Sequence, residues 1–159
     1  AASGGGITNW DQWILTSDLS GTASPITDNL SRNDNHGFDK LGSGMSVSSG
    51  TFTFPTTGTW LILGHASVNT SSDDWSAFTI HYTADASAGE NATWGESCAA
   101  GFNYPGTVYK QISISSNFGI TDVAEQKVRM VVSSFGGTLM GQSTIVRTNW
   151  SFIRLGDAS

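Results

Sequence analysis

Three histidines are the side chains of this sequence best suited to metal binding or proton transfer. His36 lies in a polar segment, whereas His65 and His81 lie in segments that alternate between apolar and polar residues. A structural zinc site needs three or four nitrogen, sulfur or oxygen ligands at a workable spacing. No H-x-x-x-H, H-E-x-x-H or C-x-x-C pattern occurs in the chain. The sequence therefore predicts no metal site at these histidines.

Carboxylates and serines offer the remaining routes to chemistry. Five loop carboxylates could gather round a calcium ion: Asp73, Asp74, Asp85, Glu90 and Glu96. No EF-hand or other fixed ligand spacing supports such a site, so we expect no cofactor, with Ca²⁺ as the alternative. The G-x-S-x-G elbow of serine hydrolases is absent, and nothing selects an acid and base pair from thirteen Asp and Glu. We therefore expect no catalytic residues and no enzyme activity.

Six tryptophans give the chain a second kind of candidate site. Indole rings can stack on the C–H faces of sugars when they are exposed. Trp75 and Trp94 lie in or beside polar loops, and they are the predicted ligand-contact residues. Trp60 and Trp150 have apolar neighbours, which favours packing in a core or between copies.

Composition limits the class of protein and its partners. At 159 residues the chain is one domain by length, and we predict a flexible arm over residues 1–6 and a domain over residues 7–159. Seven Lys and Arg against a net charge of −6 argue against nucleic-acid binding. No apolar run approaches the ~18 residues of a membrane span, so no membrane partner is expected. The single cysteine, Cys98, excludes an intrachain disulfide.

The elements that must position these residues are short strands joined by turns. Period-two patterns predict about eight to ten strands, including residues 10–15, 38–41, 52–54, 59–68, 75–83 and 128–132. Pro55 ends one strand, and Gly58 lets the chain reverse. The segments 60–63 and 150–155 are apolar on both faces, so each needs cover on both faces. A second copy of the chain is the expected cover, which predicts an oligomer.

The segment Phe38…Gly50-x-Phe52-x-Phe54-Pro55-x-x-Gly58-x-Trp60 resembles the central signature of C1q/TNF-like domains. The closing residues 150–157 resemble the last strand of that fold, which lines a threefold axis. The resemblance covers roughly residues 7–157. It implies an all-β, ten-stranded jelly-roll β-sandwich that forms a tight homotrimer. Six residues are then expected at the trimer interface: Trp60, Ile62, Trp150, Phe152, Ile153 and Leu155.

The segments 7–13 and 152–157 are similar to C1q-like modules of marine bacteriophage and cyanophage proteins. That resemblance implies a structural protein on the virion surface. The leading hypothesis is a capsid decoration protein that contacts the major capsid protein. The alternative is the tip of a tail fibre, attached to a fibre stem and binding a host surface glycan. A secreted, trimeric, lectin-like adhesion module is the second alternative.

Overall fold

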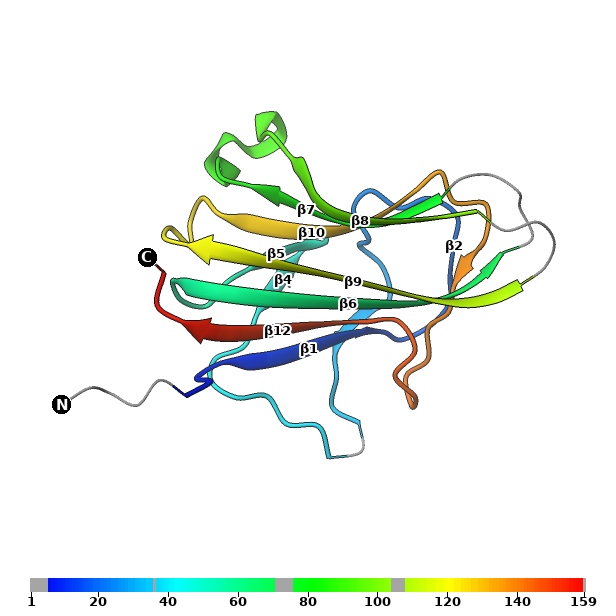
Figure 1. The fold of residues 1–159 in the computed structure, drawn as a ribbon, viewed down its shortest axis with the longest axis horizontal. Helices are drawn as coiled ribbons and strands as arrows, with labels where there is room; N and C mark the ends of the chain where they lie inside the picture. Colours follow the sequence, from blue (N-terminus) through cyan, green and yellow to red (C-terminus); the bar gives the residue numbers. More distant parts are fainter. Residues whose placement is uncertain (1–5, 36, 71–75, 104–107, 159) are drawn as a thin grey trace.

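The computed structural model describes residues 6–35, 37–70, 76–103 and 108–158, and it folds them into two antiparallel β-sheets (Figure 1). The seven-stranded sheet contains β1 (Trp10–Leu15), β2 (Leu19–Ser20), β3 (Leu30–Arg32), β6 (Gly58–Thr70), β9 (Val108–Ile120), β11 (Thr138–Leu139) and β12 (Asn149–Gly156). The five-stranded sheet contains β4 (Ser46–Ser48), β5 (Thr51–Thr53), β7 (Ser76–Thr83), β8 (Gly95–Phe102) and β10 (Lys127–Ser133). A 3₁₀ helix, η1 (Ala86–Asn91), lies between β7 and β8.

Strand β6 organises the seven-stranded sheet. It pairs with β9 along its whole length on one side, and with β12 and β11 on the other. The first and last long strands, β1 and β12, are neighbours, so the chain closes on itself in space. The other sheet has the order β4-β5-β10-β7-β8. Without the two-residue strands β2 and β11, the described part of the chain has ten strands, which confirms the predicted jelly roll.

Aromatic side chains fill the space between the two sheets. Phe52 of β5 packs on Phe152 of β12 with ring centroids 5.1 Å apart, and Phe78 of β7 packs on Trp150 at 5.8 Å. Trp60 of β6 lies 5.3 Å from Phe54. All are buried, so residues from both ends of the chain form one core. The two phenylalanines of the Phe52-x-Phe54 pattern therefore pack against the apolar segments 60–63 and 150–155 in the core.

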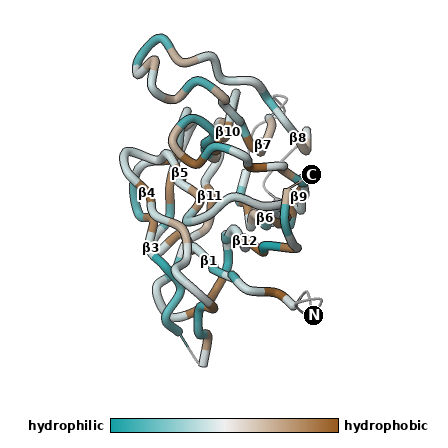
Figure 2. Tube along the Cα trace, turned by 90° about the vertical axis from the view of Figure 1, so that its left-hand side faces the viewer, coloured by the Kyte–Doolittle hydropathy of each residue, from teal (hydrophilic) through white to brown (hydrophobic). Residues whose placement is uncertain are grey.

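The predicted strand over residues 38–41 is wrong. This segment runs as a loop, and only Leu41 forms an isolated bridge, to the backbone of Trp10. The Phe38 ring meets the Trp10 ring edge-on at 6.0 Å instead of entering the core. The segment is therefore a cover over the first strand. Figure 2 shows the molecule from its side, with the β7–β8 connection projecting beyond the sheets at the top.

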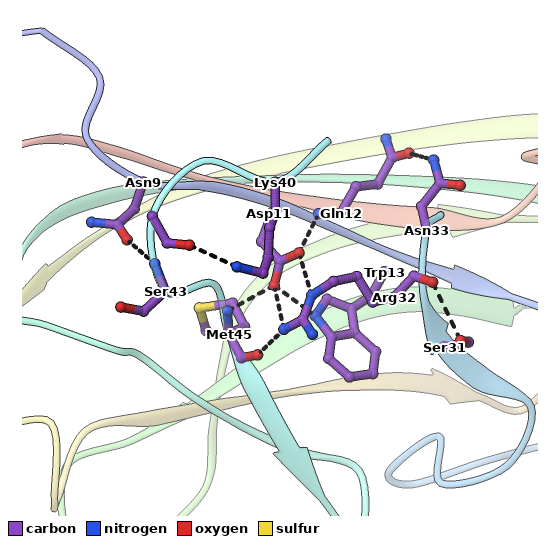
Figure 3. A network of polar contacts seen from close by, with 11 residues as sticks. Asn9, Asp11, Gln12, Trp13, Ser31, Arg32, Asn33, Lys40, Ser43 and Met45 are labelled. Carbon is purple, nitrogen blue, oxygen red and sulfur yellow. Dashed lines mark hydrogen bonds and ion pairs between the residues drawn. The ribbon is translucent and has the colours of Figure 1, made fainter. Parts of the chain in front are cut away.

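A buried ion pair fixes the loop that precedes β4 (Figure 3). The Asp11 carboxylate is 1% exposed and accepts hydrogen bonds from Arg32 Nε at 2.9 Å and Arg32 Nη2 at 3.1 Å. It also accepts from the Trp13 indole at 3.0 Å and from the Met45 backbone N–H at 2.7 Å. Arg32 lies 5.0 Å above the Trp13 ring and donates to the Met45 carbonyl. Strands β1 and β3 and the 42–45 loop are thus joined by one group, as buried charges require.

Candidate functional site

The outward side of the seven-stranded sheet is the first candidate site, and we call it the assembly face. It is defined by eight residues on three adjacent strands: Leu61, Leu63 and His65 of β6, Ser113 and Ser115 of β9, and Ser151, Ile153 and Leu155 of β12. The register places Ile153 opposite Leu61, and Ser151 and Ser115 opposite Leu63. Side chains alternate along a strand, so these residues point away from the core that Trp60 and Ile62 enter. Leu63 is 40% exposed, and Leu155 near the end of β12 is 46% exposed.

Four of the six residues predicted for the trimer interface lie in the core of their own chain instead. Each has no exposed surface: Trp60, Ile62, Trp150 and Phe152. Their assignment to a surface between copies is therefore corrected, because the five-stranded sheet already covers them. Ile153 and Leu155 lie on the outside, and their contact with another copy stays a prediction. The segment 60–63 is apolar on both faces as predicted, and its aliphatic side is the one left partly exposed.

Two hollows mark the assembly face. One, of about 430 Å³, lies over the middle of the face between Leu63, His65 and Asn149. The other, of about 520 Å³, shares His65 and extends to Tyr109 and Ile145. Tyr109 is 68% and Ile145 is 54% exposed, and His65 Nδ1 lies 3.2 Å from the Ser113 hydroxyl. Aliphatic, aromatic and hydroxyl side chains line the hollows, and Lys110 and Arg147 line the second one. A mixed surface of this kind suits packing against another protein surface.

Strand β9 adds a long sheet edge beside this face. It has thirteen residues and, among the described strands, pairs only with β6. A long edge strand presents backbone groups to which another chain can pair. Native proteins usually cover such an edge, so β9 is a second reason to expect a neighbour at this side of the molecule.

A second candidate site lies on the outward side of the five-stranded sheet. Trp94, which precedes β8, is half-buried, and the Arg129 guanidinium carbon lies 4.3 Å from its ring centroid. The register places Arg129 of β10 opposite His81 of β7, which in turn lies opposite Glu96 of β8. Trp94 as a ligand contact stays a prediction. Trp75, the other predicted contact, lies outside the described residues.

Few groups in the described structure are tuned for chemistry. Burial raises the pKa of the half-buried Cys98 thiol, which keeps it protonated. Burial also lowers the pKa of His81; Arg129 lowers it further and Glu96 raises it. Within the described residues, no group of three or more His, Cys, Asp or Glu is placed to hold a metal ion. Among the same residues, no helix is long and apolar enough to cross a membrane.

No family model and no curated protein matches this chain. Solved structures match it well. The structure of Eiger TNF from S. frugiperda has a TM-score of 0.71 and 9% sequence identity, and the alignment covers 97% of this chain and 96% of that one. The crystal structure of murine APRIL at pH 5.0 has a TM-score of 0.67 and 8% identity, covering 92% of this chain and 98% of that one. The similarity spans nearly the full length of the described sandwich, and the chain therefore has the TNF-like jelly-roll fold.

Proposed function

We propose that this chain is a non-enzymatic structural module that assembles into a homotrimer through its assembly face. The observation that carries the proposal is the exposed aliphatic side chains on the outer side of a sheet whose inner side is already fully packed. Leu63 and Leu155 remain exposed there, although the same strands bury Trp60 and Phe152 completely. The TNF-like fold and the resemblance to C1q/TNF-like sequences support three copies as the number.

The energetics require more than the two leucines. Full burial of a leucine side chain stabilises by roughly 1.5–3 kcal/mol. Leu63 and Leu155 are 40% and 46% exposed, so covering what remains contributes about 1 kcal/mol each. Association of free protomers loses at least about 4 kcal/mol of translational and rotational freedom. The trimer interface must therefore also bury the edge of β9 and the hollow lined by Tyr109 and Ile145.

Mass measurement tests the proposal directly. Light scattering of the purified chain should give three times the monomer mass of 16.7 kDa, and a monomer would refute it. Leu63→Asp should shift the protein toward monomer, because each interface would bury an unpaired carboxylate. Leu41→Asp is the matched control, since Leu41 is 46% exposed in the loop that covers β1. The control should remain a trimer.

We further propose that the trimer is displayed on a bacteriophage virion as a capsid decoration protein bound to the major capsid protein. This part rests on the sequence resemblance of residues 7–13 and 152–157 to phage modules. Cryo-electron microscopy of the particle tests it: trimers distributed over the head would support decoration. Density only at the end of a tail fibre would support the receptor-binding tip instead. Absence from purified particles would leave the secreted lectin-like module as the better account.

A further inference from the structure

A cleft of about 520 Å³ lies between η1 and the outward side of the five-stranded sheet. We call it the η1 cleft. Trp94, Lys127 and Arg129 line it, together with the hydroxyl residues Ser49, Thr51 and Ser87. In Figure 1, η1 lies at the opposite side of the molecule from β12 and β1, so the cleft is remote from the centre of the assembly face. It therefore goes beyond the proposed function and does not depend on trimer formation.

Arg129 brings a positive charge into the cleft, and no carboxylate of the described residues forms an ion pair with it. Trp94 holds the guanidinium at 4.3 Å from its ring, which fixes the direction of the side chain. The Arg129 Nε–H is buried and has no hydrogen-bond acceptor among the described residues. Burial lowers the pKa of Arg129, which records the poor solvation of its charge. An oxygen ligand that reached this guanidinium would supply the missing acceptor.

Lys127 lies two residues before Arg129 on the same outward side of β10. Its ammonium donates to the Val123 carbonyl at 2.6 Å, which leaves two N–H donors for a ligand. Glu90 also lines the cleft, and Glu96 lies one strand beyond His81. Burial lowers the pKa of Lys127, whereas Asp122 and Glu125 raise it. Lys127 therefore already has two carboxylates near it, and the cleft suits at most a singly charged anion, held mainly by Arg129. The net charge of −6 on the whole chain works against a polyanion.

The wall of the cleft is fixed by hydrogen bonds at both ends of η1. Asp85 accepts from the Thr83 hydroxyl at 2.5 Å and from the Thr93 backbone N–H at 2.9 Å. The Ser87 N–H donates to Glu125 Oε2 at 3.0 Å, which joins η1 to the β9–β10 connection. The cleft is therefore a shaped feature of the fold, and its volume lies in the range of small-ligand sites.

From this arrangement we infer that the η1 cleft binds a sugar that carries a carboxylate, of the uronic acid type. The carboxylate accepts hydrogen bonds from Arg129 and Lys127, since a planar guanidinium matches a carboxylate geometrically. The sugar hydroxyls exchange hydrogen bonds with Ser49, Thr51 and Ser87. The indole of Trp94 keeps Arg129 in place and provides apolar cover for the ring.

Calorimetric titration of the intact protein with sodium glucuronate tests this inference. Glucose keeps the ring without the charge, and acetate keeps the charge without the ring. We expect saturable binding of glucuronate, at least tenfold weaker binding of both comparators, and a loss of about tenfold or more in Arg129→Gln. Lys127→Gln should weaken binding less. Lys40→Gln is the matched control, because Lys40 also donates to a backbone carbonyl, that of Gly42 at 2.9 Å, on an exposed loop.

Three results would overturn the inference. They are no saturable glucuronate binding, equal binding of glucose or acetate, or unchanged affinity in both Arg129→Gln and Lys127→Gln. If Arg129→Gln lowers the melting temperature strongly, Lys127→Gln decides, since its side chain is at the cleft wall and not under the indole. The oligomeric mass is measured in the same samples. A monomer that binds glucuronate refutes the trimer alone, and a trimer that does not bind it refutes the cleft alone.

Discussion

Replacing Asp11 by asparagine tests whether the buried ion pair holds the first strands together. The Asp11 carboxylate is the acceptor in five hydrogen bonds, whose N–H donors belong to Arg32, Trp13, Met45 and Gln12. An asparagine has the same shape, but one of its two terminal atoms is an NH₂ group. Whichever way the amide turns, that group faces N–H donors and accepts from none of them.

The expected loss of stability follows from this geometry. With the NH₂ group at the Oδ1 position, the contacts from Arg32 Nε and the Gln12 N–H are lost, and Arg32 keeps its charge without a counter-ion. Removing one partner of a buried pair costs about 3–5 kcal/mol. The Arg32 side chain is 34% exposed, so water recovers part of that loss. We expect Asp11→Asn to lower the free energy of unfolding by about 2–4 kcal/mol.

Chemical unfolding at one fixed protein concentration measures this loss, because the stability of an oligomer depends on concentration. The matched control is Asp157→Asn. Asp157 also pairs with an arginine, Arg154 at 2.6 Å, but its side chain is 96% exposed. The control should lose less than about 1 kcal/mol. Equal losses in the two variants would refute the argument that burial, and not pairing itself, sets the energy.

Two further predictions concern turns and loops. Gly50 and Gly21 both have a positive φ, of +75° and +80°. A Cβ at Gly50 would lie 2.4 Å from the Ile26 carbonyl oxygen, whereas a Cβ at Gly21 would meet nothing within 4 Å. Gly21→Ala should cost roughly 1 kcal/mol from the backbone alone, and Gly50→Ala clearly more, in thermal unfolding; equal costs would remove the steric argument. The Thr83 hydroxyl has the largest effect on the pKa of Asp85 and lowers it; burial raises it less, and the Thr93 N–H lowers it further. The stability that the ionised Asp85 contributes is therefore complete above the ordinary Asp pKa, and it is lost as pH falls through the lower pKa of the folded state. The protection factor of the Thr93 amide, which compares its exchange rate with that of an unprotected amide at the same pH, should therefore fall below about pH 4. Asp85→Asn should abolish that pH dependence, and a dependence that persists in the variant would contradict the assignment.

The sequence predicted the strands well where alternation was strong and turns were marked. Residues 52–54 and 59–68 appear as β5 and β6 with only small shifts of their ends. Pro55 and Gly58 delimit the turn. Proline fixes its own φ and lacks an N–H, whereas glycine reaches backbone conformations that other residues avoid. The strand prediction for residues 38–41 was wrong because Phe38 and Leu41 are equally compatible with a loop that packs on Trp10.

The candidate site was harder to predict, because it depends on which face of a strand meets the other sheet. Trp60 and Ile62 face one way and Leu61 and Leu63 the other, and both pairs are apolar. Nothing local distinguishes the faces. The five-stranded sheet takes the aromatic pair because large rings fill the space between sheets, where Trp60 meets Phe54. The aliphatic pair is left outside.

The η1 cleft shows a different limit. Trp94 was singled out from its polar neighbourhood, but Arg129, its partner, is thirty-five positions further along the chain. In the sequence, Lys127 and Arg129 alternate with the apolar residues Val128 and Met130 of the predicted strand, which is the signal available for a solvent-facing side. The strand order β10-β7-β8 places Arg129 next to the loop that contains Trp94, although the two residues are far apart in the sequence. Non-local pairing of this kind has no marker in a single sequence.

The distribution of charge separates the two surfaces and leads to a last prediction. The centre of the assembly face presents aliphatic and hydroxyl side chains and one histidine, and Lys110 and Arg147 line only the hollow at its rim. The η1 cleft has Lys127 and Arg129 in its wall. Burying uncompensated cations between copies would be costly, so the proposed trimer should leave the cleft open. Leu63→Asp should then leave the affinity for free glucuronate unchanged. The same variant should bind a uronic acid polymer much more weakly than the trimer does, since three linked sites bind with avidity. Surface plasmon resonance on an immobilised polymer measures this, and an equal loss for the free sugar would show that the two surfaces are not independent.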